Sequence, residues 1–288
     1  MRKPCHHWIA LATALLALAP TLSRAEVARV EIASRTDVAN GAAFGPTGSY
    51  EQLVGKIYFS VDPANGRNRV IVDLDKAPKN ATGRVEMSAD LAILKPKDST
   101  KGNGVALLDV VNRGNKTVLT GFNRASGTGA NEMGDGLLMR MGYTVIWVGW
   151  EFDVVRRNGA IRIDVPSAMG ITETVRATFV PTARNTSTQV GDLAAYSPSD
   201  PASRQNTLTV RDGAMGKPTT IARDQWSLDG NTVTLPTGFE PGRTYELSYL
   251  ASNPPVAGLG FAAVRDTAAW IKYAPDALVS ARQGLAVG

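Results

Sequence analysis

Residues 104–111 read GVALLDVV, and this stretch decides how the rest of the chain is interpreted. Its apolar side chains are interrupted only by Asp109, which is typical of a strand buried on both faces in a parallel sheet. Residues 143–150 (YTVIWVGW) form a second run of this kind. Between them, the spacing of leucine and methionine in residues 131–142 predicts a helix, with glycine as its stop. Strand, loop, helix and strand in this order predict a βαβ unit with a right-handed crossover.

The N-terminal side of this unit consists of β-rich runs separated by turn residues. Residues 27–32 alternate as a strand does, and residues 50–61 (YEQLVGKIYFSV) form a second run, so the two predict a hairpin. Residues 68–74 (NRVIVDL) and 84–94 (RVEMSADLAIL) are predicted as a third and a fourth strand. We therefore expect residues 26–153 to form N-terminal antiparallel β-strands, followed by the first part of the parallel core.

The C-terminal side begins with a β-rich insertion, predicted for residues 154–252, which could act as a cap over an active site. Its five expected strands are bounded by Pro, Gly, Asn or Asp and cover residues 161–165, 175–180, 207–211, 232–235 and 245–250. In the remaining stretch, 253–288, residues 256–273 have one apolar helical face. Residues 283–288 (QGLAVG) resemble the beginning of another buried strand, and we expect the chain to be the N-terminal piece of a longer protein.

Residues 1–25 are predicted to be a signal peptide. Arg2 and Lys3 supply a positive start, residues 8–19 are uncharged and apolar, and small residues precede the predicted cleavage point between Ala25 and Glu26. This apolar run is shorter than the roughly 20 residues needed to cross a bilayer, so no membrane span is expected. The protein is predicted to be periplasmic or secreted.

Cleavage would remove Cys5, His6 and His7, after which the chain has neither cysteine nor histidine. A disulfide, a thiol nucleophile and a Cys or His zinc site are therefore excluded, and no metal or cofactor is expected. Three of the 31 Lys and Arg residues lie in the predicted signal peptide. The processed chain therefore has 28 basic and 26 acidic residues, and its net charge is +2. Because basic residues do not cluster with aromatic ones, nucleic acid is not an expected partner.

Several short motifs follow one another in order along the chain. They include residues 30–32 (VEI), 34–36 (SRT), 48–51 (GSYE), 89–90 (AD), 94–96 (LKP), 111–116 (VNRGNK), 134–136 (GDG) and 258–266 (GLGFAAVRD). Together they resemble a family of exported bacterial α/β-hydrolase-domain proteins, mostly uncharacterised and presumed to be esterases. The resemblance covers nearly all of the processed chain but only roughly the N-terminal half of the family. It implies an α/β fold: an incomplete α/β-hydrolase-like core with N-terminal β-strands and a β-rich insertion.

The resemblance also implies where catalytic groups would lie. In such proteins the strand matching residues 284–288 leads into the nucleophile elbow G-x-S-x-G, so the nucleophile is expected just after Gly288 and no catalytic residue is expected within this chain. A chain without histidine cannot supply a Ser-His-Asp triad by itself. The loop 112–116 would contribute to the oxyanion hole, with Arg113 and Gly114 as candidates, because glycine lets the backbone approach a ligand closely. Equally, Gly114 could serve only a tight turn, with Arg113 in solvent.

Two functions remain open from the sequence. The first is hydrolysis of a small-molecule carboxylic ester by the complete protein. The second is a non-catalytic exported binding module whose β-strands contact polysaccharide or an envelope protein. Trp147 and Trp150 could line a substrate pocket or, as we favour, belong to the core.

Overall fold

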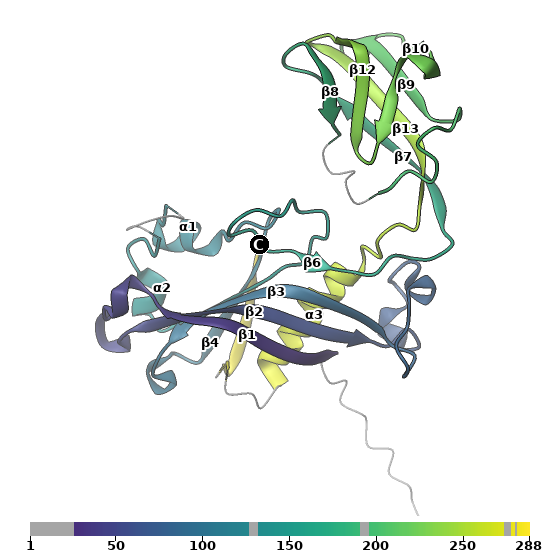
Figure 1. The fold of residues 1–288 in the computed structure, drawn as a ribbon. Coiled ribbons are helices and arrows are strands. Elements are labelled where there is room, and N and C mark those ends of the chain that lie inside the picture. The colour runs from purple at the N-terminus through teal and green to yellow at the C-terminus, as the bar shows by residue number, and fades with distance from the viewer. Residues whose placement is uncertain (1–25, 127–131, 191–195, 274–277, 280) are drawn as a thin grey trace, which may run out of the picture.

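The computed structural model describes residues 26–126, 132–190, 196–273, 278–279 and 281–288. The predicted signal peptide lies outside the described residues. The described part contains fourteen strands and three α-helices, arranged in a lower and an upper body (Figure 1). The lower body is built on one seven-stranded sheet, whose strands are β1 (Val27–Asp37), β2 (Tyr50–Val61), β3 (Val85–Pro96), β4 (Val105–Val110), β5 (Thr144–Val148), β6 (Ile163–Asp164) and β14 (Gln283–Val287).

The predicted α/β fold class, an incomplete α/β-hydrolase-like core, is wrong, because the chain is mostly antiparallel β-sheet. The order in the large sheet is β1-β2-β3-β5-β4-β14, with β6 added beside β3. The pairs β1/β2, β2/β3 and β3/β5 are antiparallel, and only β4/β5 and β4/β14 are parallel. The long strands β1 to β3 pair through local connections, which antiparallel pairing permits without a crossover helix.

The described helices between β4 and β5 are too short for an alternating core. Among the described residues between β4 and β5, the α-helices are α1 (Val118–Asn123) and α2 (Leu137–Arg140), where the sequence predicts one helix over 131–142. Residue 131 lies outside the described residues. The carboxylate of Asp135 accepts a hydrogen bond from the N–H of Leu137 (2.9 Å), the first residue of α2. The predicted C-terminal helix is confirmed as α3 (Leu259–Tyr273).

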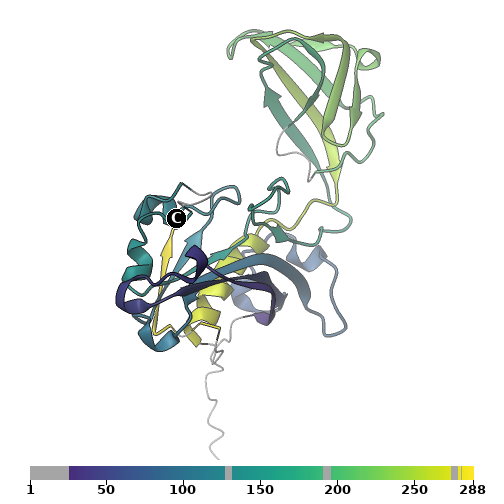
Figure 2. The ribbon, with the colours of Figure 1, turned by 60° about the vertical axis from the view of Figure 1, so that its left-hand side comes forward.

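The two faces of the large sheet are covered by different elements (Figure 2). One face packs against α3, whose buried residues join the apolar residues of β2, β3 and β5 in one core cluster. The opposite face packs against α1 and α2, and Trp147 lies in that second cluster. The parallel pairing of β4 with β5, inferred from their continuous apolar runs, is confirmed.

One predicted strand does not form, and another forms without being buried. Residues 68–74 form turns instead of a strand, because the Asn68 side chain donates to the Asp62 carbonyl (2.8 Å) and closes the loop locally. Val70 and Val72 are consequently exposed, by 84% and 75%. Residues 283–287 do form a strand parallel to β4, but β14 is an edge strand and Leu285 is half exposed, not buried.

Gly260 lets α3 approach the end of β5 closely. A Cβ atom at Gly260 would lie 2.1 Å from the backbone oxygen of Trp150. We expect Gly260→Ala to lower the free energy of unfolding by about 2 kcal/mol, because the helix must shift away from the sheet. Urea unfolding measures the change. In the control, Gly121→Ala in α1, the added methyl meets no atom within 4 Å, so this variant should be neutral or slightly stabilising. Equal stabilities of the two variants would contradict the prediction.

The upper body is a small β-structure with its own core. Its strands are β7 (Thr172–Phe179), β8 (Asn185–Gln189), β9 (Thr207–Asp212), β10 (Thr219–Ile221), β11 (Ser227–Asp229), β12 (Thr232–Phe239) and β13 (Arg243–Ser252). They form a four-stranded sheet, β10-β9-β13-β7, and a three-stranded sheet, β11-β12-β8. Phe179, Phe239 and Tyr245 contact one another in its core, with ring centroids 5.0 to 5.5 Å apart. The predicted strand at 161–165 instead joins the lower sheet as β6.

Candidate functional site

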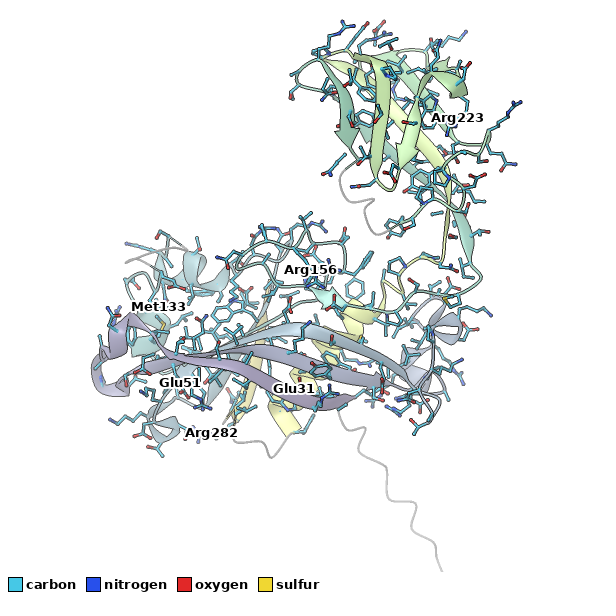
Figure 3. The ribbon with its side chains drawn as sticks, in the orientation of Figure 1. Glu31, Glu51, Met133, Arg156, Arg223 and Arg282 are labelled. Carbon is cyan, nitrogen blue, oxygen red and sulfur yellow. The ribbon has the colours of Figure 1, made fainter. Side chains whose placement is uncertain are left out.

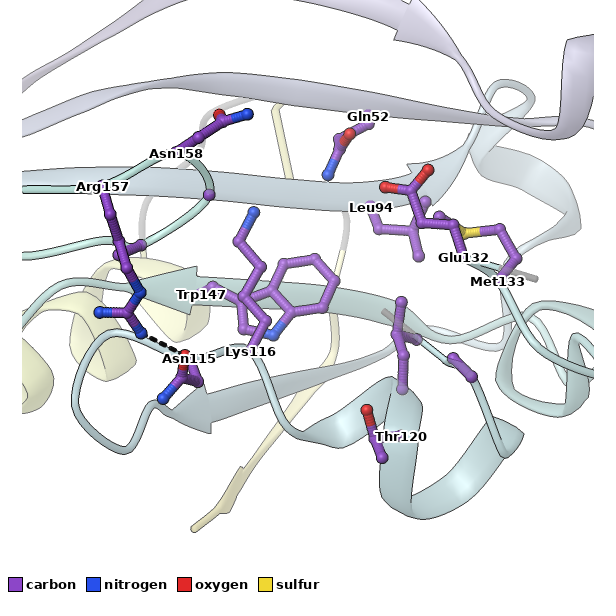
Figure 4. Close-up of a pocket in the computed structure, with 14 residues that line it drawn as sticks. Gln52, Leu94, Asn115, Lys116, Thr120, Glu132, Met133, Trp147, Arg157 and Asn158 are labelled. Carbon is purple, nitrogen blue, oxygen red and sulfur yellow. Dashed lines mark hydrogen bonds between the residues drawn. The ribbon is translucent and has the colours of Figure 1, made fainter. Parts of the chain in front are cut away.

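A cavity of about 310 Å³ lies beside the carboxyl ends of β4 and β5 (Figure 4). Its walls come from the loop after β4, from α1, from the strands β2, β3 and β5, and from the segment that follows β5. The lining residues are Gln52, Leu94, Asn115, Lys116, Leu119, Thr120, Ala125, Glu132, Met133, Trp147, Arg157, Asn158, Gly159 and Ala160. All of them belong to the lower body.

The floor of the cavity is held by Asp109, the residue that interrupts the apolar run of β4. Asp109 is fully buried, and its Oδ2 accepts hydrogen bonds from the Thr117 N–H (2.9 Å), the Val118 N–H (2.9 Å) and Trp147 Nε1 (2.8 Å). The Thr117 hydroxyl donates to the other carboxylate oxygen (3.2 Å). One carboxylate thus fixes both the loop after β4 and the Trp147 ring. Trp147 belongs to the core, as predicted, and also lines the cavity.

Lys116 lies above that ring, and its amine points into the cavity (Figure 4). Its Nζ atom is 5.3 Å from the centre of the Trp147 ring, a distance at which a cation is attracted to the aromatic face. Burial lowers the pKa of Lys116, and the carboxylate of Glu132 partly offsets this by favouring the charged amine. Among the residues that the structure describes, Nζ has neither a hydrogen-bond acceptor nor an ion-pair partner. The cavity therefore presents a partly desolvated amine.

The remaining polar groups of the cavity are mostly neutral. Arg157 is tied to the loop after β4, since its guanidinium donates to the Asn115 side chain and to the Arg113 carbonyl (3.4 Å). Gln52, Thr120 and Asn158 offer amide and hydroxyl groups that can donate or accept hydrogen bonds. A cation with neutral hydrogen-bonding groups and one carboxylate, that of Glu132, around it suits a small ligand that carries oxygen acceptors.

The two predicted oxyanion-hole residues lie next to this cavity but not in its lining. The Arg113 guanidinium contacts Asp153 Oδ1 (2.8 Å) and Glu151 Oε1 (3.4 Å), so it is an ion-pair partner of the segment after β5. Gly114 is buried with a φ of +75°, and a Cβ atom there would lie 2.8 Å from the Ile161 carbonyl oxygen. The glycine thus has the tight-turn role, and an oxyanion role for either residue stays a prediction. The nucleophile expected after Gly288 also stays a prediction.

Sequence reasoning missed Lys116, although it ends the quoted VNRGNK motif. A lysine in a polar loop gives no signal of burial by itself. Only the fold shows that Trp147 and Asn158 approach it from other segments.

In the described ranges, no group of three or more His, Cys, Asp or Glu residues is arranged to hold a metal ion. None of the helices in this part of the chain is both long and apolar enough to cross a membrane. No protein-family model matches the chain, and a search of curated proteins found no match.

Proposed function

We propose that the cavity beside β4 and β5 binds a small carboxylic ester or its carboxylate product. The observation that carries this proposal is the partly buried amine of Lys116, which faces the cavity and has no hydrogen-bond acceptor among the described residues. A charged donor of this kind forms a hydrogen bond to a carbonyl or carboxylate oxygen about twice as strong as a neutral donor does. A volume of about 310 Å³ lies at the small end of the usual range for ligand pockets, which favours a short acyl chain.

The proposal includes a role in ester hydrolysis outside the cytoplasm, and the family resemblance supports this part. Residues 26–288 contain no histidine, so they cannot activate a serine in the usual Ser-His arrangement. We therefore propose that this chain supplies the substrate pocket, while the nucleophile and its base follow Gly288. Residues 26–288 alone should bind the ester without hydrolysing it.

The alternative, a polysaccharide-binding module, has weaker support. The upper body has a hollow lined by Ala202, Arg204, Arg223, Asp224 and Trp226 (Arg223 is labelled in Figure 3). Its tryptophan is only 4% exposed, and the Arg223 guanidinium lies 4.2 Å from the centre of its ring. The ring face that a sugar would stack on is thus already covered.

Calorimetric titration of residues 26–288 with butyrate and with p-nitrophenyl acetate tests the binding part, and release of nitrophenolate tests hydrolysis. We expect binding of both compounds without turnover. Hydrolysis is expected only from a protein that continues through the reading frame beyond Gly288. Failure to bind either compound, together with binding of soluble oligosaccharides, would overturn the proposal in favour of the binding module.

A further inference from the structure

Glu26, the first described residue, is held by a cluster of polar groups at the start of β1. Its Oε2 accepts a hydrogen bond from Asn68 Nδ2 (2.9 Å) and lies 3.2 Å from Arg265 Nη2. Its Oε1 accepts from the Asp62 N–H (3.0 Å) and lies 3.2 Å from Arg84 Nη2. Only 8% of this side chain is exposed. The position of Glu26 is therefore fixed by four partners from three separate segments.

Asp266 on α3 belongs to the same cluster. Its two carboxylate oxygens lie 3.0 Å and 2.8 Å from the Nε and Nη2 atoms of Arg265, and only 7% of the side chain is exposed. Burial raises the pKa of Asp266, the Arg265 guanidinium counters that rise, the Glu26 carboxylate raises the pKa further, and the Glu26 backbone N–H lowers it. The carboxylates of Glu26 and Asp266 are thus joined through Arg265 in one cluster.

The charges of this cluster do not balance. Three carboxylates, those of Glu26, Asp62 and Asp266, lie within 4 Å of only two guanidiniums, those of Arg84 and Arg265. Glu26 and Asp266 are more than nine-tenths buried and each contacts a guanidinium, whereas Asp62 is 39% exposed and lies 3.8 Å from Arg84. One further positive charge at this place would neutralise the cluster.

We propose that cleavage between Ala25 and Glu26 creates this charge, and that the new α-ammonium of Glu26 forms an ion pair with Asp266. A peptidase of the export pathway adds water across the amide: the C–N bond breaks, Ala25 keeps the carboxylate, and the Glu26 nitrogen becomes protonated. The ammonium has three N–H donors where the amide had one. The cluster is thus a binding site for the amino terminus of the processed chain, separate from the ester cavity, and it makes the processed protein more stable than its extended form.

The first experiment identifies the terminus and compares two proteins. The full chain is exported from a bacterial host, and the mass of the product should correspond to a chain that begins at Glu26. A protein that begins at Glu26 is then compared with one that carries three additional alanines before Glu26, which moves the ammonium away from Asp266. At pH 7 we expect the protein that begins at Glu26 to unfold about 3 °C higher. A product that begins elsewhere, or equal unfolding temperatures, would overturn the proposal.

The variant Asp266→Asn tests whether the difference in unfolding temperature comes from the ion pair with Asp266 or from the changed length of the N-terminus. The variant should lower the unfolding temperature of the protein that begins at Glu26 clearly more than that of the extended protein. Asp212→Asn is the control, because this 85% exposed carboxylate pairs with Arg243 in the upper body and should affect both proteins equally. An equal effect of Asp266→Asn in both proteins would contradict the proposed pair.

The dependence on pH gives a third readout. An α-amino group has an ordinary pKa of roughly 7.7–8.0, and the ion pair raises this value in the folded protein. The advantage of the Glu26 terminus should be present below that ordinary pKa and disappear as the pH rises through the raised one. The charged groups that face the amine are Glu26, Asp62, Arg84, Arg265 and Asp266. A difference that persists unchanged at pH 10 would argue against the α-ammonium as its source.

Discussion

Asp109→Ala should lower the free energy of unfolding by about 4 kcal/mol, because it leaves several buried donors without an acceptor. The N–H groups of Thr117 and Val118 and the Nε1 of Trp147 all donate to one oxygen of this fully buried carboxylate. Each buried donor left unpaired costs about 1–3 kcal/mol, in addition to the cavity that the smaller side chain creates. Urea unfolding, followed by circular dichroism, measures the loss.

Two matched variants show which part of this effect comes from hydrogen bonding. Trp147→Phe removes one of the donors and keeps an aromatic ring in the floor of the cavity, so its cost should be about 2 kcal/mol. Asp109→Asn keeps one acceptor oxygen and should lie between the wild type and Asp109→Ala. If Asp109→Ala costs less than Trp147→Phe, the carboxylate does not organise the loop after β4.

The parallel strands at the centre of the large sheet could be predicted from sequence, whereas the fold class could not. The continuous apolar runs of β4 and β5 depend on burial of both faces, which is a local property of each strand. The fold class, in contrast, depends on how the long strands β1 to β3 pair and on the length of the helices. Because α2 ends after four residues, the βαβ pattern read from residues 131–142 overestimated the helical content.

The candidate site could be predicted only in outline. The sequence predicts a role for the loop after β4 but favours Arg113 and Gly114, which face the segment after β5. Lys116 gains its properties from residues far away in sequence, such as Gln52 and Trp147. Burial of a loop lysine is a tertiary effect, so its pattern in the sequence resembles that of any solvated lysine.

Lys116→Met should weaken binding of butyrate by about 10- to 100-fold and should at the same time leave the fold as stable or more stable. Loss of the charged donor removes a hydrogen bond of roughly 1.5–3 kcal/mol to the ligand oxygen. The unliganded protein, in contrast, no longer buries part of an amine that lacks a hydrogen-bond acceptor among the described residues, and methionine packs well against an aromatic ring. Calorimetry measures the affinity and urea unfolding the stability.

The lowered pKa of Lys116 predicts how the stability difference between the wild type and Lys116→Met depends on pH. An amine whose folded pKa lies below its unfolded value of about 10.4 costs stability at low pH, and the cost is relieved as the pH rises from the folded pKa towards 10.4. The wild type should therefore gain stability relative to Lys116→Met over that window, while its affinity for butyrate falls.

Lys97→Met is the control for this substitution, because Lys97 pairs with Asp37 at the surface and is not part of the cavity lining. It should leave the affinity for butyrate unchanged, since it removes an amine that the ligand does not reach. If Lys116→Met instead destabilises the protein and binds butyrate as the wild type does, Lys116 supports the loop after β4. The oxygen-binding group of the cavity would then have to be sought among Gln52, Thr120 and Asn158.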